Sequence, residues 1–191
     1  MQKLLRAIRL DASDTYVFER AAAAGEWVVS GAFMFWDQDP RKLEGRSKQA
    51  FRAGFLGLSS FGWSTLAVVV EAGDDERAAA RESLAAYLMA EQGAPTLEVA
   101  RAAAEEELAF AASLAEHSLQ TLVAVHRSVT AGGEISEQFR TFHAADAKQA
   151  TAMPCSAGAF AVVEDHQGGD GDTFDLAATV AAGRSTPARS S

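Results

Sequence analysis

The spacing of apolar residues predicts three strands in the first part of the chain. Residues 5–10 alternate apolar side chains with arginine, which is typical of a half-buried strand. Residues 15–20 are β-branched and aromatic, and they predict a second strand. Residues 27–36 form a long apolar and aromatic run that predicts a third strand, with Gly31 at a bulge. The short connections favour an antiparallel meander.

A helix is predicted for residues 40–55, followed by a buried strand. Asp39 can cap this helix and Pro40 suits its first position. Its apolar residues recur with a period of 3.6, and the opposite face is basic. Residues 63–71 predict a strand at the centre of the sheet, because its middle is apolar without interruption.

Two long helices are predicted in the middle of the chain. Residues 73–92 begin with three acids, which suit the positive end of a helix. After Gly93 and Pro95, Thr96 can cap a second helix that runs to about residue 116. We expect the two helices to form a hairpin over one face of the sheet. Their predicted packing positions are Ala80, Leu84, Tyr87, Leu88, Leu97, Leu108, Ala111 and Leu114.

The last third of the chain completes the predicted sheet. Residues 121–129 predict a strand, residues 135–142 predict a short amphipathic helix or strand, and residues 159–164 predict an edge strand. The predicted fold is α+β, mainly an antiparallel sheet of about five to six strands with two or three helices packed on one face. Residues 1–164 form the single domain, and residues 165–191 form a flexible acidic and Ser-Pro-Arg tail.

Composition narrows the class of protein. The chain has 191 residues, of which 48% are hydrophobic and 23% charged, as in one globular domain. Its single cysteine, Cys155, excludes a disulfide within the chain. The first ten residues lack a secretory signal, and the longest apolar run is far below the ~20 residues that span a bilayer. We therefore expect a cytoplasmic protein that does not bind membranes.

The charge is unevenly distributed. The net charge of −9 argues against nucleic-acid binding, which needs clustered Lys and Arg. Residues 1–60 hold nine Lys and Arg against seven Asp and Glu, whereas residues 61–116 hold three against eleven. The basic residues are therefore concentrated before the helix hairpin, and the acidic residues within it.

A metal site has little support in the sequence. Glu105, Glu106 and Glu107 are consecutive on a helix, so they fan around its axis and cannot form one cluster. One of them can join His117 or His126 in a site, but the known metal-binding spacings are absent. Solvated glutamates and structural or exposed histidines are the favoured interpretation, and no metal or cofactor is expected.

The basic helix and the glycine-rich stretch after it are the best candidates for a ligand site. Arginine and bare backbone N–H groups both suit an anion, although residues 54–62 match neither glycine-rich phosphate-binding motif. The alternative is a solvated helix face and tight packing of the next aromatic residue. In strand 121–129, adjacent residues must face opposite ways. The candidate ligand-binding residues are Arg46, Arg52, Trp63, His126 and Arg127.

The aromatic run at residues 27–36 needs cover on both faces if it is a strand. Such exposure can mark a protein interface. We therefore expect self-association, as in a homodimer, or a protein partner.

Short stretches spread between Leu4 and Phe142 resemble a proteobacterial family of uncharacterised proteins. The resemblance rests on residues 8–11, 13–15, 18–19, 26–27, 35–36, 52–57, 62–66, 105–107 and 124–127. It transfers no catalytic residue. It implies an accessory role near molybdenum or iron–sulfur oxidoreductases, because similar proteins are encoded beside their genes.

Two functions follow from the sequence. The favoured one is a non-enzymatic accessory or protein-interaction module, linked by the resemblance to a redox or metalloenzyme system. The alternative is a binder of a small anionic ligand, or an enzyme acting on one, that uses Arg46, Arg52 and the glycine-rich loop beside them.

Overall fold

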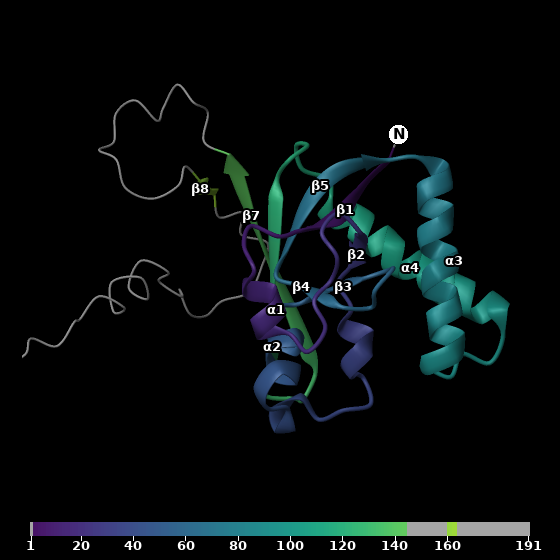
Figure 1. The fold of residues 1–191 in the computed structure, drawn as a ribbon. Coiled ribbons are helices and arrows are strands. Elements are labelled where there is room, and N and C mark those ends of the chain that lie inside the picture. The colour runs from purple at the N-terminus through teal and green to yellow at the C-terminus, as the bar shows by residue number, and fades with distance from the viewer. Residues whose placement is uncertain (1, 145–159, 164–191) are drawn as a thin grey trace, which may run out of the picture.

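The computed structural model describes residues 2–144 and 160–163. These residues form one antiparallel sheet with the strand order β4-β3-β2-β1-β5-β6-β7-β8, together with four α-helices and two short 3-10 helices (Figure 1). The predicted α+β class is confirmed, with more strands than the five to six expected. In the described part of the chain, no helix is both long enough and apolar enough to cross a membrane.

Strands β1 (Gln2–Ile8) and β5 (Leu66–Ala72) form the centre of the sheet. They pair antiparallel along their whole length, and Leu5 lies opposite Val69. Both of these side chains are fully buried. The uninterrupted apolar run therefore predicted the position of β5 correctly, since β5 lies between β1 and β6.

The predicted strand at residues 15–20 is wrong. The chain forms a short helix there, α1 (Ser13–Val17). The Thr15 hydroxyl donates to the carbonyl of Ala12, and the buried Asp14 carboxylate accepts from the Thr65 hydroxyl at 2.5 Å. Local and long-range hydrogen bonds of these polar side chains outweigh the strand preference of their neighbours.

The third predicted strand is correct only at its start. Strand β2 (Trp27–Val29) ends before Gly31, whose φ of 77° lies in the left-handed region. A Cβ at Gly31 would lie 2.6 Å from the Leu56 Cβ, so glycine is required by space as well as by conformation. The glycine turns the chain into the 3-10 helix η1 (Ala32–Phe35) rather than forming a bulge.

The predicted helix at residues 40–55 is divided in two. Asp39 caps the 3-10 helix η2 (Pro40–Lys42) by accepting a hydrogen bond from the Arg41 N–H. Helix α2 (Gly45–Ala53) then begins after two extended residues. Strand β3 (Phe55–Gly57) follows at once and was not predicted, because its three residues are too few to show a period.

Thr65 divides the fourth predicted strand into β4 (Trp63–Ser64) and β5. Its backbone N–H donates to Asp14 of α1 at 3.3 Å. The edge strand β4 pairs with β3. A polar tie to α1 thus marks the place where the chain passes from the sheet edge to the sheet centre.

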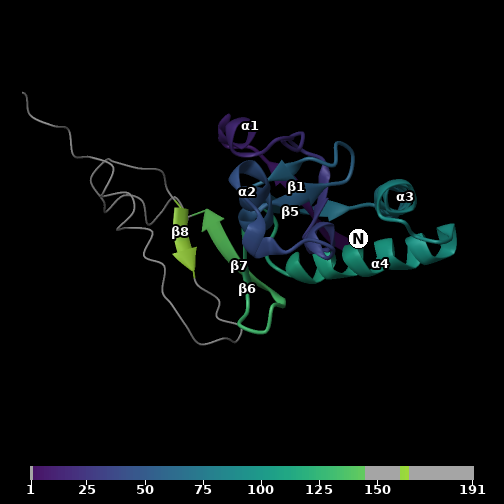
Figure 2. The ribbon, with the colours of Figure 1, turned by 90° about the horizontal axis from the view of Figure 1, so that it is seen from below.

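Helices α3 (Asp74–Glu91) and α4 (Leu97–Leu114) form the predicted hairpin. Figure 2 shows α4 running along one side of the sheet with α3 beside it, and α1 on the other side of β1 and β5. Thr96 caps α4 by accepting from the Val99 N–H. Leu97 is 43% exposed, so its predicted packing role is wrong. The buried positions of the hairpin are Ala80, Leu84, Ala85, Leu88, Ala100, Ala104, Leu108 and Ala111.

The sheet ends with β6 (Leu122–Val129), β7 (Ile135–Ala144) and β8 (Phe160–Val163). Of the two alternatives for residues 135–142, the strand is confirmed, and β8 is the predicted edge strand. The ring centroids of Phe55 on β3 and Phe139 on β7 are 6.4 Å apart, although four strands lie between β3 and β7 in the sheet. The sheet therefore curls around the buried face that these two rings share. The predicted tail, residues 165–191, lies outside the described residues.

Candidate functional site

Arg127 lies on the curled inner side of β6 and is 1% exposed. Its Nε donates to the Glu137 Oε1 of β7 at 2.7 Å, and its Nη2 donates to the carbonyl and the hydroxyl of Ser30. The Ser30 hydroxyl donates to the same Glu137 oxygen. Arg127 therefore joins the end of β2 to the hairpin of β6 and β7 from within the core.

The same guanidinium also closes the carboxyl end of α2. Its Nη1 donates to the carbonyl of Phe51 at 3.0 Å and to that of Gly54 at 2.8 Å. The last carbonyls of a helix have no partners within the helix, and a cation suits that negative end. The five N–H groups of arginine thus make the five hydrogen bonds described, and none is left for a ligand.

Glu107 of α4 faces the pair of Arg127 and Glu137. The pKa of Glu107 is raised to about 7, mainly by burial and also by the Glu137 carboxylate, against the opposing effect of the Arg127 guanidinium. A carboxyl group that titrates near neutral pH can act as a general acid or base. Such chemistry also needs a cavity for a substrate, and Glu107 is not among the residues that line the small pocket near α1.

The glycine-rich loop already holds an anion, the carboxylate of Glu26. Its Oε2 accepts from the N–H groups of Ser59 and Ser60 at 2.7 and 2.9 Å, and its Oε1 accepts from the Ser60 hydroxyl. A Cβ at Gly57 would lie 2.5 Å from the Glu26 Cδ. The loop is therefore an anion-binding loop whose anion comes from the chain itself. Binding of an external anion there stays a prediction.

Two other predicted ligand-binding residues lie apart from Arg127. Trp63 packs in the core, where its ring stacks on Phe35 at a centroid distance of 5.4 Å. A Cβ at Gly54 would lie 2.6 Å from the Trp63 ring, so that glycine serves packing. Arg46 is exposed on α2 and forms no hydrogen bond or ion pair with another described residue.

His126 lies on the outer side of β6, away from Arg127. Partial burial lowers its pKa, and so do the positive charges of Arg52 from α2 and Arg140 from β7. These three groups form a cationic surface that we call the outer patch. The charge of Arg52 thus reaches His126, whereas the alternation along β6 directs His126 to the face opposite Arg127.

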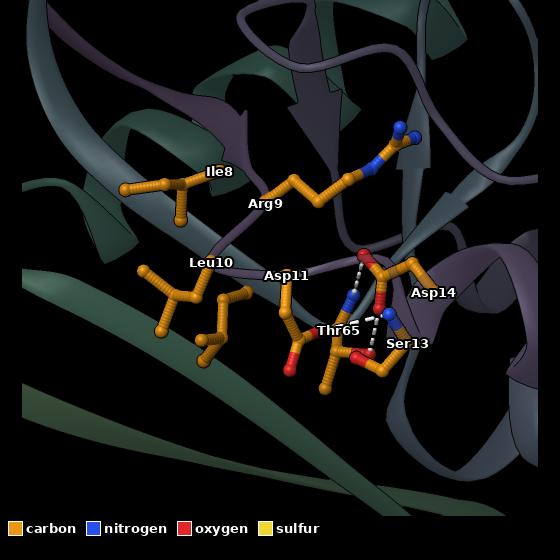
Figure 3. Close-up of a pocket in the computed structure, with 8 residues that line it drawn as sticks. Ile8, Arg9, Leu10, Asp11, Ser13, Asp14 and Thr65 are labelled. Atoms are coloured by element: carbon orange, nitrogen blue, oxygen red, sulfur yellow. Dashed lines mark hydrogen bonds between the residues drawn. The ribbon is translucent and has the colours of Figure 1, made fainter.

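A small pocket lies near α1, and none of the predicted site residues lines it. Its volume is about 130 Å³, below the several hundred Å³ typical of small-molecule sites. Figure 3 shows Asp14 on its wall, bound to Thr65. Because the carboxylate already has partners, the pocket offers little for recognition. Its lining residues are Ile8, Arg9, Leu10, Asp11, Ser13, Asp14, Thr65 and Leu66.

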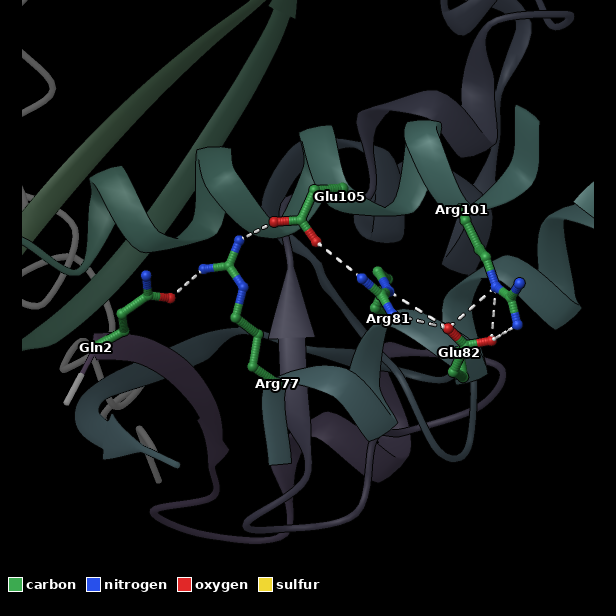
Figure 4. A network of polar contacts seen from close by, with 6 residues as sticks. All are labelled: Gln2, Arg77, Arg81, Glu82, Arg101 and Glu105. Carbon is green, nitrogen blue, oxygen red and sulfur yellow. Dashed lines mark hydrogen bonds and ion pairs between the residues drawn. The ribbon is translucent and has the colours of Figure 1, made fainter. Parts of the chain in front are cut away.

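Two acidic residues of the helix hairpin, Glu82 and Glu105, form ion pairs with arginines of the hairpin. Glu105 binds Arg77 and lies within 4.0 Å of Arg81, and Glu82 binds both Arg81 and Arg101 (Figure 4). This network joins α3 to α4. Over residues 2–144 and 160–163, no three His, Cys, Asp or Glu residues are placed to hold a metal ion.

Several large apolar side chains lie in solvent. Trp36, after η1, is 72% exposed, and Tyr16 of α1 is 75% exposed. Scattered apolar residues are normal on a surface, but an indole so far from the core is unusual. Neither side chain takes part in the polar clusters described above.

Comparison with known proteins places the chain in a family. The sequence model of a family of unknown function, DUF6505, matches residues 1–157. The chain belongs to DUF6505. No curated protein and no solved structure matches the chain. The predicted membership of an uncharacterised family is thereby confirmed.

In this DUF6505 chain, the sequence analysis missed the partners rather than the central residues. Arg127 was found, but Ser30, Glu137 and the carbonyls of α2 were not, since only the curled sheet brings them together. Arg140 was missed as well. Pairing of the predicted strands in register was the signal that would have placed it diagonally from His126.

Proposed function

We propose that this chain is a non-enzymatic protein-interaction module whose contact surface includes Trp36. The observation that carries the proposal is the exposure of this indole, 72%, at the end of η1. Tryptophan is enriched among the residues that supply most of the energy of protein interfaces. A partner that covers Trp36 removes this apolar surface from water.

The polar groups of the inner side support a non-enzymatic role. Arg127 and Glu26, the best candidates for holding a substrate, are satisfied by other parts of the chain. The pocket of about 130 Å³ is small for a substrate. The indole of Trp36, in contrast, lies on the surface, where a macromolecule can reach it.

Cross-linked capture from a lysate of the source organism tests the proposal. We expect wild-type protein to retain a partner that Trp36→Ala loses, with unchanged circular dichroism. Tyr16→Ala is the matched control, because Tyr16 is equally exposed on a different element. If neither a captured partner nor self-association in light scattering depends on Trp36, the proposal fails.

The resemblance adds a finer proposal about the partner. It favours a component of a redox or metalloenzyme system in the cytoplasm, which mass spectrometry of the captured protein identifies. A partner outside such a system would contradict this finer proposal and leave the interaction role standing.

Fluorine NMR provides a second test of contact between the partner and Trp36. In protein labelled with 5-fluorotryptophan, the Trp36 signal is assigned by Trp36→Phe. The half-buried Trp27 and Trp63 provide internal controls in the same spectrum. We expect the captured partner to move or broaden the Trp36 signal and to leave the other two in place.

A further inference from the structure

We propose that the partner presents an acidic segment that lies across the outer patch of Arg52, His126 and Arg140. The inference rests on the proposed function and names the chemistry of the partner. It concerns a different surface from Trp36, so the two can be tested separately. The positive charge of this surface contrasts with the chain's net charge of −9.

The strand register builds the patch. Ala124 pairs with Arg140, and His126 pairs with Gln138. His126 and Arg140 are therefore diagonal neighbours on the same face, about 7–8 Å apart, which is within reach of long side chains. Helix α2 packs against β6 and adds Arg52, whose charge acts on the His126 ring.

The charges of the patch have no counter-ions among the described residues. Arg52, His126 and Arg140 form no hydrogen bond or ion pair there. Other arginines of the chain do: Arg77 binds Glu105, and Arg101 binds Glu82. Since unpaired like charges repel one another, an acidic partner gains from both arginines at once, and from His126 when its ring takes up a proton.

The shape of the patch favours a segment of protein over a small molecule. Small-molecule sites are concave and bury most of the ligand, and the residues of the outer patch are not among those that line the small pocket near α1. The positive surface also continues along α2, where Arg46 and Lys48 are exposed. A chain of carboxylates can follow such a surface, and each added contact strengthens the others by multivalency.

Arg127 makes this surface possible from the opposite side of β6. The carboxyl end of α2 carries a partial negative charge, which would weaken the binding of an anion beside Arg52. Arg127 donates to two carbonyls at that end, those of Phe51 and Gly54. The buried arginine therefore offsets the negative end of the helix, while Arg52 stays exposed for a partner.

Protonation of the His126 ring makes binding to the outer patch depend on pH. Burial lowers the pKa of His126, as do the charges of Arg52 and Arg140, and a lowered pKa favours the neutral ring. Carboxylates beside the ring favour its charged form, and binding must then take up a proton. We expect affinity for an acidic segment to increase as the pH falls towards 6.

Binding of a dye-labelled peptide of ten glutamates, followed by fluorescence anisotropy at low salt, tests the inference. We expect Arg52→Gln combined with Arg140→Gln to weaken binding by about tenfold. The matched control is Arg81→Gln combined with Arg101→Gln, which removes the same charge from paired, half-exposed arginines of the hairpin. The control should bind as the wild type does.

Several results would overturn the inference. One is equal weakening by both double variants, because it shows only an effect of net charge. Another is complete displacement by inorganic phosphate at the same concentration of charge, which indicates a small-anion site. A third is a dimer that the patch variant dissociates, because the occupant is then a second copy. If capture of a partner does not depend on Trp36 but the peptide still binds the outer patch, the proposed function is refuted and the inference about the patch is not.

Discussion

The two sides of strand β6 differ sharply, although His126 and Arg127 are neighbours in sequence. On the inner side, Arg127 is 1% exposed and makes five hydrogen bonds within the chain. On the outer side, His126 lies beside two arginines and has no partner among the described residues. The inner side serves the fold, and the outer side is available for binding.

This difference shows how to distinguish a structural cation from a binding one. A buried guanidinium costs several kcal/mol unless every donor is satisfied, so Arg127 has to be enclosed by acceptors. An exposed cation carries no such cost and can remain unpaired until a partner arrives. The residue type alone does not separate the two roles.

The largest expected effect comes from the inner side. Arg127→Met should lower the free energy of unfolding by about 3–5 kcal/mol, because it leaves Glu137 and the carbonyls of α2 without their donor. Arg52→Gln should change it by less than about 0.5 kcal/mol. Urea unfolding of both variants measures the difference. Similar losses of unfolding free energy in the two variants would contradict the difference between the two sides of β6.

The loop that binds the Glu26 carboxylate is a second place where a buried charge is enclosed by the chain. Gly57→Ala should destabilise the protein by about 1–3 kcal/mol, because the new Cβ would lie 2.5 Å from the Glu26 carboxyl carbon. Gly132→Ala is the control, since its Cβ would meet only the Thr130 hydroxyl at 3.7 Å. Thermal unfolding compares them. A Gly57 variant as stable as the control would show that the loop is not tightly closed.

The inner side should also respond to pH through Glu107. Its pKa is about 7 in the folded protein, above the ordinary 4.5, so the folded state holds a proton that the unfolded chain releases. Stability from this group is therefore present below pH 4.5 and is lost as the pH rises to 7. Glu107→Gln should stabilise the protein by about 1–2 kcal/mol at pH 8 and change little at pH 4.5.

Glu98→Gln, at an exposed position of the same helix, provides the control for that pH dependence. It should leave the pH profile of the unfolding free energy close to that of the wild type. If Glu107→Gln shows the same profile as the wild type between pH 5 and 8, then Glu107 does not hold a proton near neutral pH.

The smallest effect is expected from the ion pairs of the helix hairpin. Arg77→Gln removes the bond to Glu105, whose side chain is half exposed. The loss should be below about 1 kcal/mol and should disappear in 1 M salt, where such pairs are screened. Unfolding of the variant at low and high salt measures it. A larger, salt-independent loss would show that the network contributes more than a surface pair.

Local patterns predicted the long elements of the fold. The apolar run of β5 and the capping Thr96 of α4 each carry their signal within a few residues. The pattern of apolar and polar residues failed where contacts with distant residues determine the local structure. Residues 15–17 of the predicted strand belong to helix α1, where Asp14 accepts a hydrogen bond from Thr65, and β2 ends before Gly31, where Leu56 and Trp63 leave no space for a Cβ.

The candidate site was predictable as a set of residues but not as an arrangement. Alternation along β6 correctly separated His126 from Arg127. The curl that brings Ser30 and Gly54 to Arg127 depends on the whole sheet, so no local signal contains it. The same holds for Glu26, whose partners lie more than thirty residues away in the glycine-rich loop.

The account predicts that the outside of β6 binds an acidic partner while the inside holds the fold. The most direct test is the pKa of the His126 ring, followed by NMR with and without the peptide of ten glutamates. We expect a pKa below 6.5 in the free protein and a clear increase when the peptide is bound. A His126 pKa that the peptide leaves unchanged would contradict the account.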